Sequence, residues 1–293
     1  MDVKDIALSG ETILHQKYQI QEVYYWGHTG IIYMATDLDN HTKIAIKEYC
    51  PYRLSNRDIG GKNVVCKGNA YRALFLQGLD NFSRECKIVQ QVSNIDTPYD
   101  KCTLQYLDSF EENDTRYLVT EYIEGMNLKE YIENGNEYSV SECMGYLLKT
   151  IEQIHEKGII HRDVKPANII IRKDGKPVLI DFGSACYTTD ENCIAQFVSN
   201  GYSAPELYQG GTSDVRTDVY SIGALTYYML TGCRLPPADE ITIDEPIPPV
   251  SEYADVTDIL EKAVMKAIEP DLNKRASDTK MIESALNAEN CKK

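Results

Sequence analysis

The segment IIHRDVKPANIIIRKDGKPVLIDFG, residues 159–183, constrains the fold more than any other stretch of the chain. Its two apolar runs flank Asp174-Gly175, a dipeptide that strongly favours the two-residue turn of a β-hairpin. Pairing the strands outward from that turn sets Asn168 opposite Asp181. We therefore predict a hairpin that presents an amide oxygen and a carboxylate side by side at its open end.

The side chains at this open end suit the transfer of a phosphoryl group. Amide and carboxylate oxygens are hard ligands of the kind that can hold Mg²⁺ against a substrate phosphate. Asp163 and Lys165 precede them on the same loop, and they add a carboxylate that can accept a hydroxyl proton and a fixed positive charge. Phosphoryl transfer needs these groups because its catalysis is mostly positioning and charge neutralisation.

Short β-like segments dominate the chain from Tyr18 to about Tyr122. Separated by turn signals such as DLDN and EEND, they predict an antiparallel sheet built from YQIQEVYYW, GIIYMATD, TKIAIKEY, TLQYLDSF and TRYLVTEYI. One helix is predicted around LDNFSRECKIVQQV, where apolar residues recur at helical spacing. Glu85 falls on the apolar face of this helix, so its carboxylate needs a cationic partner or a hydrogen-bond network.

The second half of the chain is predicted to be mainly helical, which makes the fold class α+β. The predicted helices are SVSECMGYLLKTIEQIHEKG, TDVYSIGALTYYMLTG, and the closing pair DVTDILEKAVMKAIE and TKMIESALNAEN. Gly232 suits the C-terminal end of the second of these helices. The segment from Pro51 to Gly78 is interpreted as a long connection, of the sort that is often functional or mobile.

Charge and cysteine content disfavour several classes of function. The formal net charge of −15 disfavours binding to phosphate backbones, so no nucleic-acid partner is expected. Nine cysteines without a C-x-x-C pair argue against a disulfide framework and against a zinc site. No apolar run approaches the roughly 18 residues of a membrane helix, and the first residues lack the pattern of a secretory signal. We expect a cytoplasmic protein without a membrane segment.

Taken in order along the chain, these motifs resemble those of the protein kinase family. HRDVKPAN resembles the catalytic loop, DFG at 181–183 the metal-binding turn, and APE at 204–206 the end of the activation segment. Upstream, IAIKEY resembles the strand motif that carries the nucleotide lysine, Lys47, and Glu85 takes the place of its helix partner. Downstream, Asp218 and Arg275 match family positions interpreted as structural, with Arg275 pairing with Glu206.

The resemblance implies a two-lobed protein kinase-like fold. Its N-lobe would be a small antiparallel sheet with one key helix, and its C-lobe would be larger and mainly helical. The expected boundaries are an N-terminal extension over residues 1–17, the N-lobe over 18–122, the C-lobe over 123–286 and a short tail over 287–293.

The resemblance also assigns catalytic roles. Asp163 would orient or deprotonate the acceptor hydroxyl, and Lys165 would neutralise charge on the γ-phosphate of ATP. Asn168 and Asp181 would bind Mg²⁺, with Mn²⁺ as a possible substitute. Lys47 would hold the α- and β-phosphates, oriented by its helix partner.

The remaining nucleotide contacts are implied by two further segments. YLVTEYIEG resembles the segment between the lobes, which makes Thr120 the gatekeeper and places adenine against the backbone of Glu121 and Ile123. Ala45, on the strand of the nucleotide lysine, is assigned to the same site.

The glycine-rich loop departs from the family pattern. Aligned with G-x-G-x-x-G-x-V, the chain has Tyr25, Gly27, Gly30 and Ile32 at the four marked positions, so a tyrosine stands in place of the first glycine. We expect this loop to cover ATP nonetheless, because the later catalytic groups are all present.

The lysine in RDVKPAN is typical of serine/threonine kinases, and AIKEYCPYRLSNRD resembles bacterial members. The resemblance therefore implies ATP-dependent transfer to Ser/Thr hydroxyls of protein substrates. Thr188 and Thr189 are candidates for autophosphorylation beside Arg162, whereas Ser199 is interpreted as a structural hydroxyl. Two alternatives stay open. The altered loop suggests a pseudokinase or nucleotide-binding scaffold, and the shared architecture also allows a kinase for a small molecule. The sequence leaves the oligomeric state open.

Overall fold

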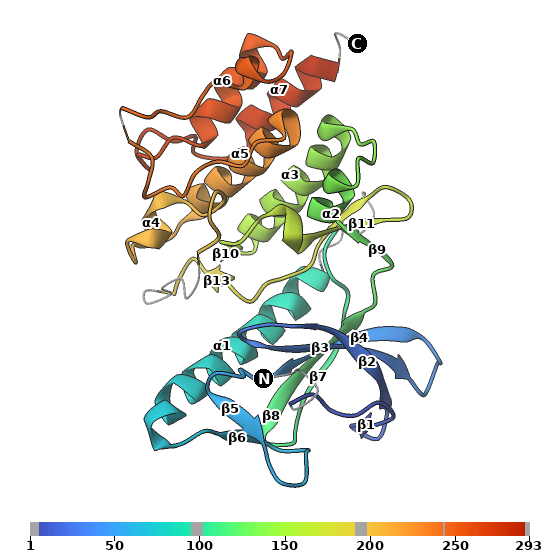
Figure 1. Ribbon diagram of the computed structural model, residues 1–293. Helices are drawn as coiled ribbons and strands as arrows, with labels where there is room; N and C mark the ends of the chain where they lie inside the picture. Colours follow the sequence, from blue (N-terminus) through green and yellow to red (C-terminus); the bar gives the residue numbers. More distant parts are fainter. Residues whose placement is uncertain (1–5, 95–101, 191–197, 243, 291–293) are drawn as a thin grey trace. The chain divides into compact units, whose positions relative to one another are not determined.

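The computed structural model describes residues 6–94, 102–190, 198–242 and 244–290, and these residues divide into two units (Figure 1). Unit 1 contains residues 6–94 and 104–123, and unit 2 contains residues 102–103 and the described residues from 124 onward. The division falls after Ile123, one residue beyond the predicted boundary. Within the described residues, no helix is both long enough and apolar enough to cross a membrane.

Unit 1 is built on a six-stranded antiparallel sheet, as predicted. Its strand order is β1-β2-β3-β4-β8-β7. The bounds are Ile13–Leu14 for β1, Tyr18–Trp26 for β2, Gly30–Asp37 for β3, Lys43–Tyr49 for β4, Thr115–Glu121 for β8 and Tyr106–Glu112 for β7. Buried and partly exposed residues alternate along β3 and β4, which is the pattern of strands with one face on a core.

The two edges of this sheet curl toward each other. The Tyr18 hydroxyl on β2 donates to Asp108 Oδ2 on β7 at 2.9 Å, and the Phe110 ring of β7 stacks on the rings of both Tyr18 and His15. The His15 N–H donates to a carboxylate oxygen of Glu112 at 2.7 Å. These contacts join strands that are not neighbours in the sheet.

Helix α1, Asn69–Ser93, packs on the sheet of unit 1 and begins ten residues before the predicted helix. Its buried stripe includes Phe75, Phe82, Glu85 and Val89. The first turns escaped prediction because most of their large apolar residues, namely Tyr71, Leu74 and Leu76, are exposed, and Phe75 alone gives no clear stripe. Two short strands, β5 (Ser55–Arg57) and β6 (Val64–Cys66), form a hairpin inside the segment predicted as a long connection.

A buried polar network joins this hairpin and the N-terminal segment to β4. Glu48 is fully buried and accepts hydrogen bonds from Tyr33 at 2.8 Å, from Tyr117 at 2.7 Å and from the guanidinium of Arg57. Arg57 also donates to the carbonyl oxygen of Ile6 at 2.7 Å, and Ile6 is itself buried. The described part of the predicted N-terminal extension is therefore part of unit 1.

Unit 2 is mainly helical, as predicted. Its α-helices are α2 (Leu128–Glu133), α3 (Val140–Glu156), α4 (Pro205–Tyr208), α5 (Val215–Thr231), α6 (Asp258–Ala267) and α7 (Lys280–Asn290), with 3₁₀ turns η2 (Pro166–Asn168) and η3 (Val250–Glu252). Its short strands are β9 (Gly125–Asn127), β10 (Ile159–Ile160), β11 (Ile169–Arg172), β12 (Pro177–Leu179) and β13 (Cys186–Tyr187).

Local sequence signals fix the ends of several of these helices. Ser139 caps α3 and Thr257 caps α6, each through a side-chain oxygen that accepts a backbone N–H of the first turn. Asp214 begins α5 in a capping box with Thr217. Gly232 ends α5 in the left-handed conformation, with φ of 71°, as the sequence predicted.

The hairpin at residues 168–181 forms, but the predicted register was wrong by one residue. Strands β11 and β12 pair Ile169 with Leu179, and the N–H of Ile180 donates to the carbonyl oxygen of Asn168 at 3.0 Å. The loop holds residues 173–175 and has Gly175 in the left-handed conformation, with φ of 83°. Three-residue loops of this kind end in a glycine, whereas the prediction assumed a two-residue turn. Asp181 therefore follows the residue opposite Asn168.

Candidate active site

The loop between β10 and η2 brings four polar side chains together. The Asp163 carboxylate accepts hydrogen bonds from Lys165 Nζ at 2.7 Å and from Asn168 Nδ2 at 2.9 Å. Its other oxygen accepts the hydroxyl of Ser199 at 2.6 Å, and Lys165 Nζ also donates to that hydroxyl at 2.8 Å. The structure thus places three predicted catalytic residues in one cluster. Ser199 joins them through its hydroxyl, and its interpretation as a structural hydroxyl stays a prediction.

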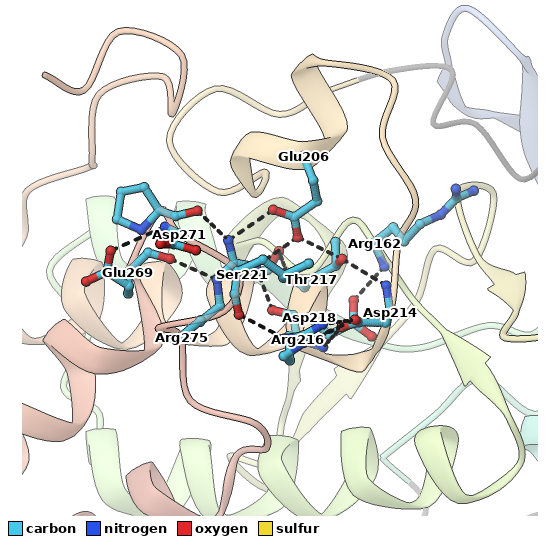
Figure 2. A network of polar contacts seen from close by, with 12 residues as sticks. Arg162, Glu206, Asp214, Arg216, Thr217, Asp218, Ser221, Glu269, Asp271 and Arg275 are labelled. Carbon is cyan, nitrogen blue, oxygen red and sulfur yellow. Dashed lines mark hydrogen bonds and ion pairs between the residues drawn. The ribbon is translucent and has the colours of Figure 1, made fainter.

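A buried carboxylate on α5 holds the backbone of this loop. Asp218 is fully buried and accepts the backbone N–H of His161 at 2.8 Å. It also accepts the backbone N–H of Arg162 at 2.7 Å (Figure 2). Arg162 has φ of 65°, a left-handed conformation that is uncommon for a residue with a side chain. The two hydrogen bonds to one carboxylate stabilise this strained turn, which directs the next residue, Asp163, into the cluster.

His155 is a partner of Asp218 that the sequence interpretation missed. Its Nε2 lies 2.8 Å from Asp218 Oδ2. Burial alone would raise the pKa of Asp218. The contact with His155 and the backbone N–H of His161 outweigh that effect, so the pKa of the Asp218 carboxyl lies below its ordinary value. No motif or periodicity pointed to this pair, because His155 lies at the end of α3 and Asp218 more than sixty residues later.

His161 packs against the loop from inside. Its ring is fully buried, lies edge-on to Phe182 with ring centroids 4.9 Å apart, and accepts the N–H of Asp163 at Nδ1. Burial lowers the pKa of His161 below its ordinary value of 6.5, so the ring is neutral near pH 7.

The second predicted metal ligand begins the turn after β12. Asp181 Oδ1 accepts the N–H of Gly183 at 3.1 Å, and the intervening Phe182 is fully buried. Asn168 donates hydrogen bonds from its amide nitrogen to Asp163, so its amide oxygen is the atom that could bind a cation. One amide oxygen and one carboxylate fit Mg²⁺, which is usually bound by few protein oxygens together with water and substrate phosphates. The described residues contain no cluster of three or more His, Cys, Asp or Glu residues that could enclose a metal ion.

A second ion pair of unit 2 supports the APE segment. Arg275 donates two hydrogen bonds to the carboxylate of Glu206, at 2.8 and 3.0 Å, as the resemblance implied (Figure 2). Thr217 on α5 also donates to Glu206, at 2.9 Å. The bidentate pair therefore fastens the short helix α4 to α5 and to the segment that follows α6.

In unit 1 the predicted partner of Glu85 is Lys47. Lys47 Nζ on β4 lies 2.5 Å from Glu85 Oε1 on α1, where the glutamate side chain is buried. The apolar stripe of the helix placed a carboxylate against the sheet, and the strand lysine compensates its charge.

Other residues assigned to the nucleotide site line the same sheet. Ile32 on β3 pairs in register with the strand lysine, and Ala45 on β4 pairs with Thr120 on β8. Thr120 and Ile123 are buried, and Glu121 is the last residue of β8. The structure thus brings this set of residues together on three adjacent strands and the segment that follows β8.

The two glycines of the loop between β2 and β3 have different close neighbours. A Cβ atom on Gly30 would overlap the backbone oxygen of Glu48, so the pairing of β3 with β4 requires glycine at that position. A Cβ on Gly27 would lie 3.2 Å from the ring of Tyr25, which folds over the turn. The close approach of phosphate to these glycines stays a prediction.

An aromatic cluster on this loop was not foreseen. The Tyr52 ring packs edge-on against Trp26, with centroids 5.6 Å apart, and stacks on His28, with centroids 5.7 Å apart. The Tyr52 hydroxyl also lies 3.2 Å from His28 Nδ1. Tyr52 comes from the segment predicted as a long connection, so sequence reasoning had no reason to place it beside the loop.

Comparison with known proteins gives a consistent picture. The model of the protein kinase domain matches residues 26–287. A probable serine/threonine-protein kinase of Clostridium perfringens is 33% identical over 215 residues, which cover 69% of this chain and 30% of that protein. The serine/threonine-protein kinase PknB of Mycolicibacterium smegmatis is 28% identical over 278 residues, which cover 87% of this chain and 40% of PknB. The chain therefore spans well under half of the length of these relatives.

Solved structures agree with these matches. The structure described as the apo form of PpkA-294 superimposes with a TM-score of 0.80 at 26% identity, covering 96% of this chain and 99% of that one.

Proposed function

Because the chain belongs to the protein kinase family, we propose that it transfers the γ-phosphoryl group of ATP to Ser/Thr hydroxyls of protein substrates. The observation that carries the proposal is the cluster around Asp163, in which a carboxylate, an ammonium group and a hydroxyl lie within hydrogen-bond distance of one another. Such a cluster can position an acceptor hydroxyl and neutralise phosphate charge, the two tasks that dominate catalysis of phosphoryl transfer.

In the proposed reaction, the acceptor oxygen forms a bond to the γ-phosphorus while the bond to the bridging oxygen of ADP breaks. Asp163 orients the acceptor hydroxyl and accepts its proton, and Lys165 neutralises charge on the transferred group. Lys165 is preorganised for this role because its ammonium group already contacts two side chains of the cluster.

Asn168 and Asp181 are the proposed ligands of Mg²⁺, or of Mn²⁺ in its place. When bound, the metal would neutralise phosphate charge. Their oxygen chemistry supports this assignment, as does the anchoring of Asn168 to Asp163 and of Asp181 to the backbone of Gly183.

In unit 1, Lys47 is the proposed ligand of the α- and β-phosphates, and Glu85 holds its ammonium group in place. The remaining proposed nucleotide contacts are Tyr25, Gly27, Gly30, Ile32, Ala45, Thr120, Glu121 and Ile123.

The exposed Thr188 and Thr189 are the proposed sites of autophosphorylation, since both follow the segment that Arg162 fastens through the carbonyl oxygen of Ser184 at 2.6 Å. The proposal also places the domain in the cytoplasm, where ATP is available. The seven cysteines in the described parts of the chain are all free thiols, as expected in a reducing compartment.

The test is incubation with ATP, Mg²⁺ and a generic basic protein, with phosphosites read by mass spectrometry. We expect phosphate on Ser/Thr residues with the native chain and none with Asp163→Asn. The matched control is Asp174→Asn, which makes the same chemical change on the exposed hairpin loop and leaves activity intact. ATP binding without transfer in the native chain would instead indicate a nucleotide-binding scaffold, and transfer only to small molecules would contradict the proposed substrate class.

A further inference from the structure

Strand β4 contacts helix α1 at two points rather than one. Lys47 and Tyr49 are two residues apart on the strand, so their side chains extend from the same face of the sheet. Lys47 pairs with Glu85 at 2.5 Å, and the Tyr49 hydroxyl donates to the carbonyl oxygen of Phe75 at 2.9 Å. The second contact lies almost three helical turns before the first along α1.

Gly78 makes the second contact possible. It lies in the interior of α1, where glycine is disfavoured because it loses more backbone freedom than other residues. A Cβ atom at this position would overlap the hydroxyl of Tyr49 and would lie 2.9 Å from its Cζ. The absence of a side chain at Gly78 is therefore what allows the tyrosine to reach the helix backbone.

The tyrosine cannot easily move away from the helix. Its side chain is buried, and its ring contacts both Phe75, with centroids 5.3 Å apart, and Phe82, with centroids 5.9 Å apart. The carbonyl oxygen of Tyr49 accepts the hydroxyl of Thr115 on β8, which fixes the end of the strand as well. A side chain added to this face of α1 would therefore displace the helix rather than the tyrosine.

Phe75, Gly78, Phe82 and Glu85 follow one another at intervals of three or four residues, so they share one face of α1. A rotation or shift of the helix at Gly78 would consequently move Glu85 relative to the sheet. We propose that Tyr49 and Gly78 are positioning residues that set the rotation and height of α1 on β4, so that Glu85 meets Lys47. The consequence for catalysis rests on the proposed function of Lys47, whereas the consequence for the ion pair does not.

The reactivity of Lys47 toward an amine-modifying reagent tests the ion pair without any need for activity. The assay is brief reductive methylation of the folded chain with formaldehyde and a borane reductant, followed by mass spectrometry of the peptide that contains Lys47. An ammonium group held by a carboxylate reacts slowly, because methylation requires the neutral amine. Glu85→Gln, which removes the charge, sets the upper limit of the response.

Gly78→Ala is the decisive variant. We expect the methylation rate of Lys47 to rise by about fivefold or more, the factor that corresponds to about 1 kcal/mol in an equilibrium. The matched control is Gly145→Ala in the interior of α3, where an added Cβ meets no atom within 4 Å, and we expect no change at Lys47. In the double variant Tyr49→Phe/Gly78→Ala, the hydroxyl that the Cβ would overlap is gone, and the nearest remaining ring carbon lies 2.9 Å from the Cβ. Because the overlap is smaller, the Lys47 rate of the double variant should fall from that of Gly78→Ala toward the native value.

An unchanged Lys47 rate in folded Gly78→Ala would overturn the proposal, and so would a double variant no closer to the native rate than Gly78→Ala. If Gly78→Ala does not fold, Tyr49→Phe alone decides. It keeps the ring and removes only the hydrogen bond to Phe75, so a raised Lys47 rate supports the proposal and an unchanged rate refutes it.

Kinetics with ATP add the catalytic consequence. We expect kcat/KM for ATP to fall in Gly78→Ala and to recover in the double variant, in parallel with the Lys47 rate. A native chain without kinase activity would refute the proposed function while leaving the methylation result intact, so the two failures are distinguishable.

Discussion

Replacement of Arg57 by methionine should strongly destabilise unit 1. The guanidinium of Arg57 compensates the fully buried carboxylate of Glu48, and it also donates to the backbone oxygens of Ile6 and Lys62, each at 2.7 Å. Methionine fills most of the same volume but leaves the Glu48 charge buried with only hydroxyl donors, Tyr33 and Tyr117.

The expected size of the effect follows from the burial of both partners. Removal of one member of a buried ion pair costs about 3–5 kcal/mol, because the other charge is left uncompensated. Domains of this kind are stable by only about 5–15 kcal/mol, so the loss is a large share of the total. Addition of Glu48→Gln to Arg57→Met removes the buried charge and keeps one acceptor oxygen, so that one tyrosine hydroxyl still donates while the other has to accept from the new amide NH2. This second change should restore about half of the lost free energy.

The assay is urea unfolding followed by tryptophan fluorescence. Trp26 is the single tryptophan of the chain and lies in β2, so its signal reports on unit 1. Arg72→Met, on the exposed start of α1, is the matched control and should change the free energy of unfolding by no more than about 0.5 kcal/mol. A loss below about 1 kcal/mol in Arg57→Met, or a further loss when Glu48→Gln is added, would show that the pair is not the compensated buried charge inferred from the structure.

Three further outcomes are expected. Gly30→Ala should lower the free energy of unfolding of unit 1 by about 1–3 kcal/mol in the same assay, because the added Cβ forces the backbone at Glu48 to shift. Ser199→Ala should lower kcat about tenfold, the effect of about 1.4 kcal/mol in the barrier, with KM for ATP unchanged, because it removes a hydrogen bond to Asp163. Burial depresses the pKa of His161 below 6.5, so the folded state disfavours protonation of this ring. The free energy of unfolding of unit 2 should therefore be unaffected by this group above about pH 6.5 and should decrease at lower pH, by at most about 1.4 kcal/mol per pH unit. Urea titrations followed by circular dichroism between about pH 7.5 and about pH 5.5 measure this slope, which His161→Asn should reduce.

The sequence predicted the parts of the fold that depend on local periodicity and on charge. The strands at Tyr18–Trp26 and Gly30–Asp37 form with the bounds of the predicted segments. The position of Glu85 on an apolar helix face required a cationic partner or a hydrogen-bond network, and Lys47 lies beside it. In both cases a regular spacing determines which side chains face the core.

Features that depend on turn geometry or on long-range packing were not predictable in the same way. The register of the hairpin at Gly175 depends on whether the turn has two or three residues, and Asp174-Gly175 is compatible with both. Tyr52 and Arg57 lie in a segment without periodicity, and their partners come from distant strands. One signal was available, since Glu48 follows Ile44 and Ile46 in strict alternation and so had to be buried on the same face.

Strand β4 leaves little freedom for sequence drift. Three consecutive residues are each constrained by a different contact. Lys47 binds a helix carboxylate, Glu48 is the acceptor of a buried network, and Tyr49 fits a gap left by a glycine. Of the seven residues of the strand, only Lys43 is exposed. Homologues should therefore diverge here in linked sets, a change at one residue of β4 requiring a change on another element.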